Sequence, residues 1–371
     1  MKTRLLAVSA VAALALAACG EAPDESAEPS ASGGAAAAAD FLGCMVTDQG
    51  GIDDRSFNAS AWAGLQAAEA SQGIEVKYVT SKSESDYTPN VNSLVAEDCG
   101  LIVTVGFSLG DATRTAAQAN PDTEKFTIVD ENPDGDPDTA DVFEPIDNVK
   151  PLLFNTAEAA YLAGYLAAGM SETGTVGTFG GIKLPTVAVF MDGFYDGVMK
   201  YNEDKGADVK ILGWDKEKQD GLFAGKFDSP TDGKNLANNL IQSGADIIMP
   251  VAGGTGLGAA QAAQESGGKV AIVWVDADGY ESASQYKEVF LTTVEKGIAT
   301  AVETATTETV QGNYTNTPFI GTLANEGVGL APYHDYESKV PAELTAEVDA
   351  LKAQIIDGTI VVESANSPKV S

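Results

Sequence analysis

The chain has 371 residues, with 54 acidic and 22 basic side chains and a formal net charge of −32 at pH 7. Such an acid excess repels polyanions, which excludes nucleic acid and anionic lipid surfaces as partners. The one histidine, His334, excludes a histidine-rich metal site, and we expect neither a metal nor a cofactor.

The N-terminus has the pattern of an export signal. Lys2 and Arg4 precede an apolar run at residues 5–18, which is too short to span a bilayer as a mature helix. The run ends in Leu-Ala-Ala before Cys19, which resembles a bacterial lipobox. We therefore expect cleavage of residues 1–18 and acylation of Cys19. An ordinary secretory signal with a chance cysteine is the alternative.

Residues 19–39 have the composition of a flexible tether. They are rich in Ala, Ser, Pro, Gly and acids and have no large apolar side chain. Such a segment cannot bury enough surface to offset its chain entropy, so we expect it to be disordered. A disordered linker between a lipid anchor and a folded body predicts a protein attached to the cell membrane by lipid only, facing outside the cytoplasm.

From residue 40 onward, apolar runs alternate with segments of helical periodicity. The first part predicts strands at 41–47, 74–79, 101–105 and 126–129 and helices at 56–71, 88–96 and 111–119. After a change of pattern near residues 148–155, we expect strands at 175–179, 208–212, 247–251, 270–275 and 289–293. Further helices are expected at 157–170, before residue 202, and at 233–243, 257–264, 297–310 and 342–356.

This alternation predicts parallel sheets that are covered by helices on both faces. A folded part of this length exceeds a typical single core, so we expect two doubly wound α/β lobes with a ligand cleft between them. Residues 40–150 together with about 290–320 are expected in the first lobe. The second lobe is expected to hold about 151–289 together with about 321–371.

Cys44 and Cys99 lie in or just before two strands of the expected first lobe. In a doubly wound sheet with strand order 2-1-3, the first and third strands are neighbours about 4.8 Å apart, close to the Cα separation of a disulfide. An exported protein can hold such a bond. We therefore expect a disulfide here, with two buried thiols as the alternative.

Ligands of open parallel sheets bind beyond the carboxyl ends of the strands. The residues at those ends are mostly carboxylates and glycines, with one aromatic ring: Asp48, Gly106, Phe107, Asp130, Gly180, Gly181, Gly253, Gly254, Asp276 and Asp278. Carboxylates accept paired hydrogen bonds, glycines allow close backbone approach, and rings stack on flat faces. The set suits a polar solute that carries a ring, although any single acid could instead be a solvated turn or a helix cap.

The run Thr-Asp-Gln-Gly-Gly-Ile-Asp-Asp-Arg-Ser-Phe-Asn at residues 47–58 is the most informative segment. It resembles the opening motif of the basic membrane protein family of ABC-importer receptors, which includes the purine-nucleoside receptor lipoproteins. The resemblance continues at residues 105–107, 128–130, 225–228, 252–256, 275–278 and 292–296. It therefore covers nearly the whole mature chain.

The resemblance implies a periplasmic-binding fold of the first type, with three crossovers between the lobes. It implies a receptor that closes its lobes on a nucleoside and docks on the permease of an ABC importer. We expect this receptor to be a monomer and not an enzyme. The same architecture binding another polar solute, such as a sugar or a vitamin, is the alternative. An extracellular nucleoside hydrolase or a signalling receptor is a third interpretation.

The resemblance also implies ligand residues, by position. Two rings would sandwich the base: Phe57 and Phe227. Polar side chains would bond to the base edge: Asp48, Asn58 and Asp130. The ribose would be held by Asp276, Lys296 and the backbone of Gly253 and Gly254. In one departure, residues 186–189 lack the basic side chains often found before the phenylalanine that matches Phe190, which puts a base-edge contact from this segment in doubt.

Some local patterns have competing interpretations. Residues 254–259 fit a dinucleotide-binding fingerprint, with Asp276 placed 20 residues beyond Gly256, so a Rossmann oxidoreductase is a competitor. The alternating acids at 134, 136 and 138 have a spacing found in calcium loops but lack the bidentate glutamate. The adjacent acids at 53 and 54 could suggest glycoside hydrolysis but are more simply helix caps. Trp62 on the next helix is better explained by core packing than by ligand stacking.

Overall fold

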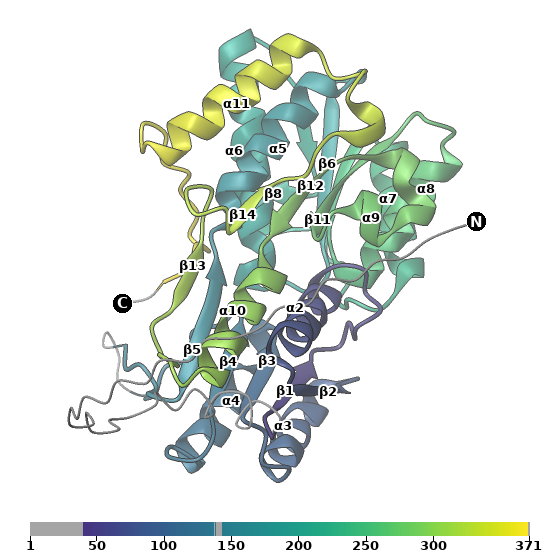
Figure 1. Ribbon diagram of the computed structural model, residues 1–371. Coiled ribbons are helices and arrows are strands. Elements are labelled where there is room, and N and C mark those ends of the chain that lie inside the picture. The colour runs from purple at the N-terminus through teal and green to yellow at the C-terminus, as the bar shows by residue number, and fades with distance from the viewer. Residues whose placement is uncertain (1–39, 137, 139–142, 370–371) are drawn as a thin grey trace, which may run out of the picture.

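The computed structural model describes residues 40–136, 138 and 143–369, which fold into two lobes that stand one above the other (Figure 1). The expected signal segment, the tether and the acylation site at Cys19 lie outside the described residues. Within the described ranges, none of the helices combines the length and the apolar composition that a bilayer span requires.

The first lobe is built on a parallel sheet with strand order β13-β5-β4-β3-β1-β2. Its strands are β1 (Leu42–Thr47), β2 (Glu75–Thr80), β3 (Leu101–Val105), β4 (Phe126–Val129), β5 (Val149–Phe154) and β13 (Phe319–Gly321). Its helices are α2 (Phe57–Gln72), α3 (Tyr87–Val95), α4 (Gly110–Ala119) and α10 (Ile298–Val310). The central strands β3, β4 and β5 are buried along their whole length, as expected for a parallel sheet between helix layers.

The second lobe repeats this architecture, with strand order β14-β12-β11-β10-β6-β7. The strands are β6 (Thr175–Gly180), β7 (Lys210–Leu212), β10 (Ile247–Val251), β11 (Ala271–Asp276), β12 (Phe290–Lys296) and the antiparallel edge strand β14 (Val328–Leu330). The helices are α5 (Thr156–Met170), α6 (Pro185–Lys205), α7 (Pro230–Gln242), α8 (Gly256–Glu265), α9 (Gly279–Ser282) and α11 (Ala342–Ile356). Strands β8 (Trp214–Asp215) and β9 (Asp220–Gly221) form a separate hairpin. The predicted fold class of two parallel-sheet lobes is confirmed.

Within the described residues, the chain passes between the lobes at three places: from β5 to α5, from β12 to α10, and from β13 to β14. Backbone hydrogen bonds join these segments. Asn155 N donates to Gly321 O (2.8 Å), and Gly297 N donates to Gly327 O (2.8 Å). The Glu158 carboxylate adds a link by accepting from the third connection, at Leu323 N (2.8 Å). The three connections therefore form one hinge region.

The expected lobe boundaries need correction at two strands. The sequence predicts no strand at residues 149–154 and ends the first part of the first lobe at residue 150. In the structure, residues 149–154 form β5, which pairs with β4 in the first sheet. The sequence also assigns residues 290–320 to the first lobe, whereas β12 pairs with β11 in the second sheet. Periodicity misses β5 altogether, and for β12 it detects a strand without saying which sheet that strand joins. The first two crossovers therefore lie at 154–156 and 296–298.

Close backbone packing holds α6 against α5. A Cβ atom at Gly193 would lie 2.3 Å from Ala157 O, and one at Gly197 would lie 1.9 Å from Tyr161 O. Any larger residue at these positions would push the two helices apart. Because α6 begins at the cleft, this contact fixes the side chains that the helix presents there.

A disulfide joins Cys44 on β1 to Cys99, which precedes β3. The two Cα atoms are 6.0 Å apart. Both cysteines are buried in the apolar cluster that α3 and α4 form with the first sheet. Strands β1 and β3 are direct neighbours in that sheet, which is the relation that the doubly wound order predicts.

Replacing both cysteines by alanine is expected to lower the free energy of unfolding by about 3–4 kcal/mol, because the bond closes a long loop in the unfolded chain. The cysteines are 55 residues apart in sequence. Denaturant titration of the parent and the double variant, followed by circular dichroism, measures the difference. The parent unfolded under reducing conditions is the control. A difference below about 1 kcal/mol would contradict the chain-entropy estimate.

Candidate functional site

A pocket of about 510 Å³, including its mouth, lies between the lobes at the carboxyl ends of both sheets. It is lined from the first lobe by the ends of β1, β3 and β4 and the start of α2, and from the second by the ends of β10 and β11 and the start of α6. The expected ligand residues that line it are Asp48, Phe57, Asn58, Asp130, Phe227, Gly253, Asp276 and Lys296. Gly254 lies just outside this lining, where its Cα faces Phe227 O and the backbone of Asp54.

The start of α2 is organised by Asp54. Its carboxylate accepts hydrogen bonds from the N–H groups of Ser56 (3.0 Å), Asn58 (2.8 Å) and Ala59 (3.0 Å). These are the otherwise unpaired donors of the first helical turn, so Asp54 acts as a helix cap. Burial raises the pKa of Asp54, and these donors oppose that shift. The cap interpretation is confirmed for Asp54, whereas Asp53 is exposed.

Asn58 and Asp48 present hydrogen-bond acceptors to the pocket. The Asn58 Nδ2 group donates to Asp48 Oδ1 (2.8 Å) and to Asp54 Oδ2 (3.1 Å), which fixes the orientation of the amide. Asn58 Oδ1 is buried and has no hydrogen-bond partner within the described part of the chain. A buried acceptor without a donor is unfavourable, so this atom is a place for a ligand N–H or O–H.

Burial raises the pKa of Asp48 to about 6, and the charges of Asp54 and Asp130 act in the same direction. The bonds from Asn58 and from Gly50 N (3.1 Å) oppose this shift, and both reach Oδ1. Gly106 lies against the other oxygen, because a Cβ there would come within 2.9 Å of Asp48 Oδ2. The positive φ of Gly106 (116°) is a second reason for glycine at this position.

Lys296 is the centre of a second polar cluster. Its Nζ atom lies 2.5 Å from Asp130 Oδ2 and 3.8 Å from Asp276 Oδ1. Asp276 Oδ2 also accepts a hydrogen bond from Ser56 Oγ (2.6 Å). All four side chains are buried. Because Lys296 and Asp276 belong to the second lobe and Asp130 and Ser56 to the first, the cluster connects the lobes.

The carboxylates of this cluster are held in an uncommon backbone conformation. Asp130 directly follows β4 and Asp276 is the last residue of β11, with φ of 66° and 70°. Aspartate is among the few residues that adopt this left-handed region, and it does so at a small energetic cost. Burial raises the pKa of both carboxyls, and Lys296 opposes the shift. The resemblance places Asp130 at the base edge, whereas in the structure it is paired with Lys296 rather than with Asp48 and Asn58.

Aromatic rings form the remaining walls. Phe57 comes from the first turn of α2, and Phe227 comes from the loop before α7. Phe227 lies against Gly181, since a Cβ at that position would be 2.3 Å from the ring. The Lys296 ammonium lies over the rings of Phe57 (5.1 Å) and Phe190 (5.0 Å), a favourable cation–π arrangement.

Several pocket residues were not expected from the sequence as ligand contacts. They are Val251, Ala252, Val275, Asp54, Leu184, Thr186, Val187 and Phe190. The last four come from α6 and the residue before it, where the sequence offers a proline that starts the helix and the family match at Phe190. Thr186 and Val187 line the pocket and carry no charge. This agrees with the departure noted in the sequence, where the segment lacks basic side chains that could contact the base edge.

The glycine-rich run at 254–259 supports Phe227 in this structure. The amide of Thr255, at the start of that run, donates to Phe227 O (2.9 Å). A Cβ at Gly256 would lie 3.0 Å from the ring of Trp274. A dinucleotide phosphate would need the amides of this turn, and one of them is already bonded to the loop that carries Phe227.

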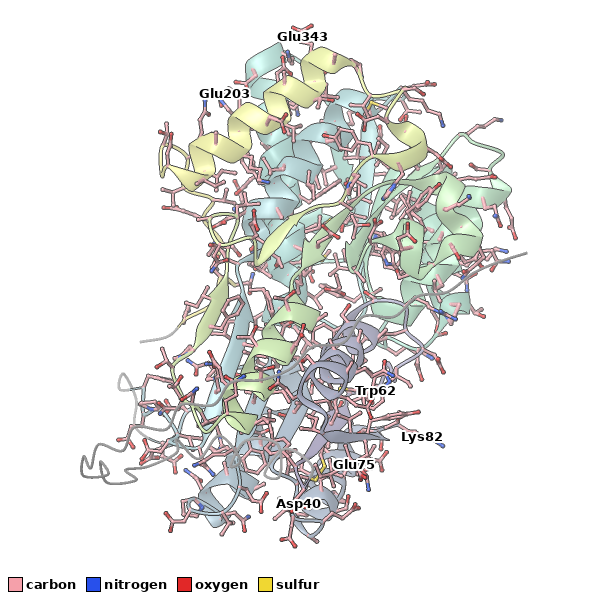
Figure 2. The ribbon with its side chains drawn as sticks, viewed as in Figure 1. Asp40, Trp62, Glu75, Lys82, Glu203 and Glu343 are labelled. Carbon is pink, nitrogen blue, oxygen red and sulfur yellow. A yellow bond between two sulfur atoms is a disulfide. The ribbon has the colours of Figure 1, made fainter. Side chains whose placement is uncertain are left out.

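The other candidate residues lie outside the pocket. Within the described ranges, no group of histidine, cysteine or acid side chains is arranged to hold a metal ion. Asp278 caps α9 through Tyr280 N (3.0 Å) and contacts His334 (2.7 Å). Asp134 accepts backbone N–H groups of its own loop. Trp62 packs edge-on against Tyr78 (4.9 Å) on the outer flank of the first lobe (Figure 2).

Comparison with known proteins agrees with this architecture. Residues 41–366 match the family described as ABC transporter substrate-binding protein PnrA-like. The chain is 33% identical to a CD4+ T-cell-stimulating antigen of Listeria innocua, over 97% of this chain and 98% of the relative. It is 32% identical to the ABC transporter nucleoside-binding protein BmpA of Lactococcus lactis, over 98% and 100%.

A solved structure gives the same result for the fold. The crystal structure of an ABC transporter solute-binding protein from Aeropyrum pernix superimposes with a TM-score of 0.76 at 25% identity, and the match covers 87% of this chain and 94% of that one. These similarities favour a receptor over a Rossmann oxidoreductase. Together with the pocket between two α/β lobes, they show that the chain belongs to the PnrA-like family of ABC transporter substrate-binding proteins.

Proposed function

We propose that this protein captures nucleosides, preferably those with purine bases, between its lobes and delivers them to the permease of an ABC importer. The main support is the buried Asn58 Oδ1, which lies beside the Asp48 carboxylate and has no hydrogen-bond partner among the described residues. The same pocket also contains the rings of Phe57 and Phe227. A heterocycle with N–H groups on its edge satisfies the acceptors, and its flat faces can stack on the rings.

The Lys296 cluster suits the sugar of such a ligand. Lys296 donates hydrogen bonds, while the carboxylates of Asp130 and Asp276 accept them from hydroxyl groups. The base then lies on the Asp48 side of the pocket and the ribose on the Lys296 side. Asp130 belongs with the ribose in this arrangement, in contrast to the base-edge position that the sequence resemblance implies.

Capture is proposed to occur by lobe closure about the hinge. The bonds Ser56–Asp276 and Lys296–Asp130 join the lobes next to the ligand pocket, so a ligand that bonds to the same groups stabilises the closed form. The Lactococcus relative is named as a nucleoside-binding protein, which supports the ligand class. We further propose that the protein acts as a monomer, is held to the membrane through acylated Cys19, and releases its nucleoside chemically unchanged.

Binding experiments with ligand parts test this proposal. Calorimetry should show tight binding of inosine and much weaker binding of hypoxanthine or ribose. Phe57→Ala should weaken inosine binding at least about tenfold through lost stacking. Trp62→Ala, which removes a ring from the same helix outside the pocket, is the matched control. If ribose binds as tightly as inosine, the sugar receptor replaces this function, and if inosine is cleaved during the titration, a hydrolase does.

Inosine affinity should depend on pH through Asp48. Its pKa of about 6 is raised above the usual value, so below about pH 6 most of the free protein carries a proton on this carboxyl, which a ligand N–H must displace. Affinity should therefore rise with pH through 6 and level off above 7, and be about tenfold weaker at pH 5 than at pH 7. Calorimetry across this range measures the profile, and Asp48→Asn should flatten it. An unchanged profile in Asp48→Asn would assign the titration to another group.

A further inference from the structure

A second chamber adjoins the ligand pocket on the Lys296 side. It holds about 920 Å³ of empty space, including its mouth. Four residues line both the pocket and the chamber: Phe107, Asp130, Thr186 and Lys296. Because these residues lie at the boundary, a ligand whose sugar contacts Lys296 has the chamber directly beside it.

The C-terminal segment, residues 365–369, forms one wall of this chamber. It is fixed to the second lobe by Asp192, a fully buried carboxylate on α6 that accepts from Ser364 Oγ (2.6 Å) and Asn366 Nδ2 (2.9 Å). Ser367 Oγ donates to Asn155 Oδ1 in the hinge (3.0 Å). Asn132 Nδ2 of the first lobe donates to Lys369 O (3.1 Å). The segment is therefore held at several points beside the cleft.

The opposite wall is apolar. Leu153 and Phe154 from β5 and Val189 from α6 are buried and line the chamber. Ala365 and Pro368 add apolar surface from the C-terminal segment. A small apolar group in the chamber would exchange water contact for contact with these side chains, which is favourable.

The charged groups of the chamber disfavour an anion. Asp130 and Glu131 both line it, and Lys296 is already paired with Asp130. Lys369, the other lysine of the lining, is exposed. A phosphate group here would lie near two carboxyl groups and beside apolar walls, and the described residues of the lining leave no buried cation to pair with it. The chamber is therefore suited to an uncharged group.

We propose that this chamber is a subsite for a small apolar substituent on the 5′ carbon of the bound nucleoside, such as a methylthio group. The inference rests on the proposed function. If the base edge bonds to Asp48 and Asn58 and the diol bonds to the Lys296 cluster, the 5′ carbon is the one remaining substituent of the ribose that can point into the chamber. The ligand class then extends to 5′-deoxy-5′-alkylthio nucleosides, and the C-terminal segment limits their size.

Calorimetry on the full protein with three ligands tests the subsite. 5′-Deoxy-5′-methylthioinosine should bind the parent at least as tightly as inosine, and inosine 5′-monophosphate should bind at least about tenfold more weakly. Ala365→Phe should weaken binding of the methylthio ligand at least about tenfold while changing inosine affinity less than about threefold. Val361→Phe is the matched control, because Val361 lies four residues before Ala365, is 72% exposed and does not line the chamber.

A second filling variant, Pro368→Phe, repeats the test from another position on the same wall, and thermal unfolding of each variant checks that it is folded. The subsite is refuted if the methylthio ligand binds the parent at least about tenfold more weakly than inosine, or if both filling variants weaken the two ligands equally. If inosine itself does not bind the parent, the proposed function fails and the subsite falls with it. If inosine binds and the methylthio ligand does not, only the subsite fails.

Discussion

Replacing Lys296 by methionine is expected to weaken inosine binding by at least about a hundredfold. Lys296 is the only basic side chain among the described residues that line the pocket, and its ammonium lies between the carboxylates of Asp130 and Asp276. Methionine keeps much of the length and the contacts with the surrounding rings but removes the charge. Removing one partner of a buried ion pair typically costs about 3–5 kcal/mol of folding stability, because the remaining charge is left uncompensated, so folding has to be measured beside affinity.

The two carboxyls should respond by taking up protons. Burial already raises the pKa of both Asp130 and Asp276, and Lys296 opposes that shift. Without Lys296 their pKa values rise further, and protonated carboxyls are poor acceptors for the ribose hydroxyls. The variant therefore loses a donor and weakens two acceptors at once.

Calorimetry with inosine measures the effect of Lys296→Met, and Lys210→Met on an exposed part of β7 is the matched control. Folding and binding can be separated with the double variant Asp130→Asn/Lys296→Met. It removes one of the uncompensated charges, so it should recover thermal stability without recovering affinity. Inosine affinity within about threefold of the parent in Lys296→Met would show that the cluster does not hold the ligand.

Much of the pocket follows from strand order alone. Asp48, Asp130 and Asp276 each come at the end of a parallel strand, and the carboxyl ends of parallel strands meet at one edge of a sheet. The sequence therefore predicts that they face the cleft. Phe227 has no such signal, because it lies in a loop without periodicity. It could be proposed only from the family resemblance, and its position depends on Gly181 and on the amide of Thr255.

Contacts between distant segments could not be predicted in this way. Ser56 and Asp276 are 220 residues apart and meet only because the two lobes contact each other at the cleft. The pairing of Lys296 with Asp130 depends on β12 belonging to the second sheet, which its apolar pattern does not reveal. The return of residues 365–369 to the cleft rests on side-chain bonds to Asp192, and a polar C-terminal segment gives no sequence signal for such a path.

The acceptors that face the base edge should make the protein strongly prefer nucleosides whose base donates hydrogen bonds on that edge. Asn58 Oδ1 and the Asp48 carboxylate offer acceptors, while both N–H groups of Asn58 are used within the protein. Inosine donates through N1–H, and guanosine adds an amino group, whereas purine riboside has the same ring system but neither the 6-oxo group nor a donor on this edge. A site built around buried hydrogen bonds rejects an analogue that lacks the partner by roughly 10⁴-fold in strong cases, so we expect at least about a hundredfold discrimination here.

Calorimetry with guanosine, inosine and purine riboside measures this preference, and the affinities should decrease in that order. Asp48→Asn replaces an acceptor by an amide that can also donate, so it should reduce inosine affinity and reduce the ratio of inosine to purine riboside affinity at least about tenfold. Asp53→Asn is the matched control, because Asp53 belongs to the same loop but is exposed. Equal affinities of the parent for inosine and purine riboside would mean that Asn58 Oδ1 and Asp48 do not contact the base. The rings could still stack on a base in that case, but its orientation in the pocket would have to be the reverse of the one proposed, with the Lys296 cluster at the base edge.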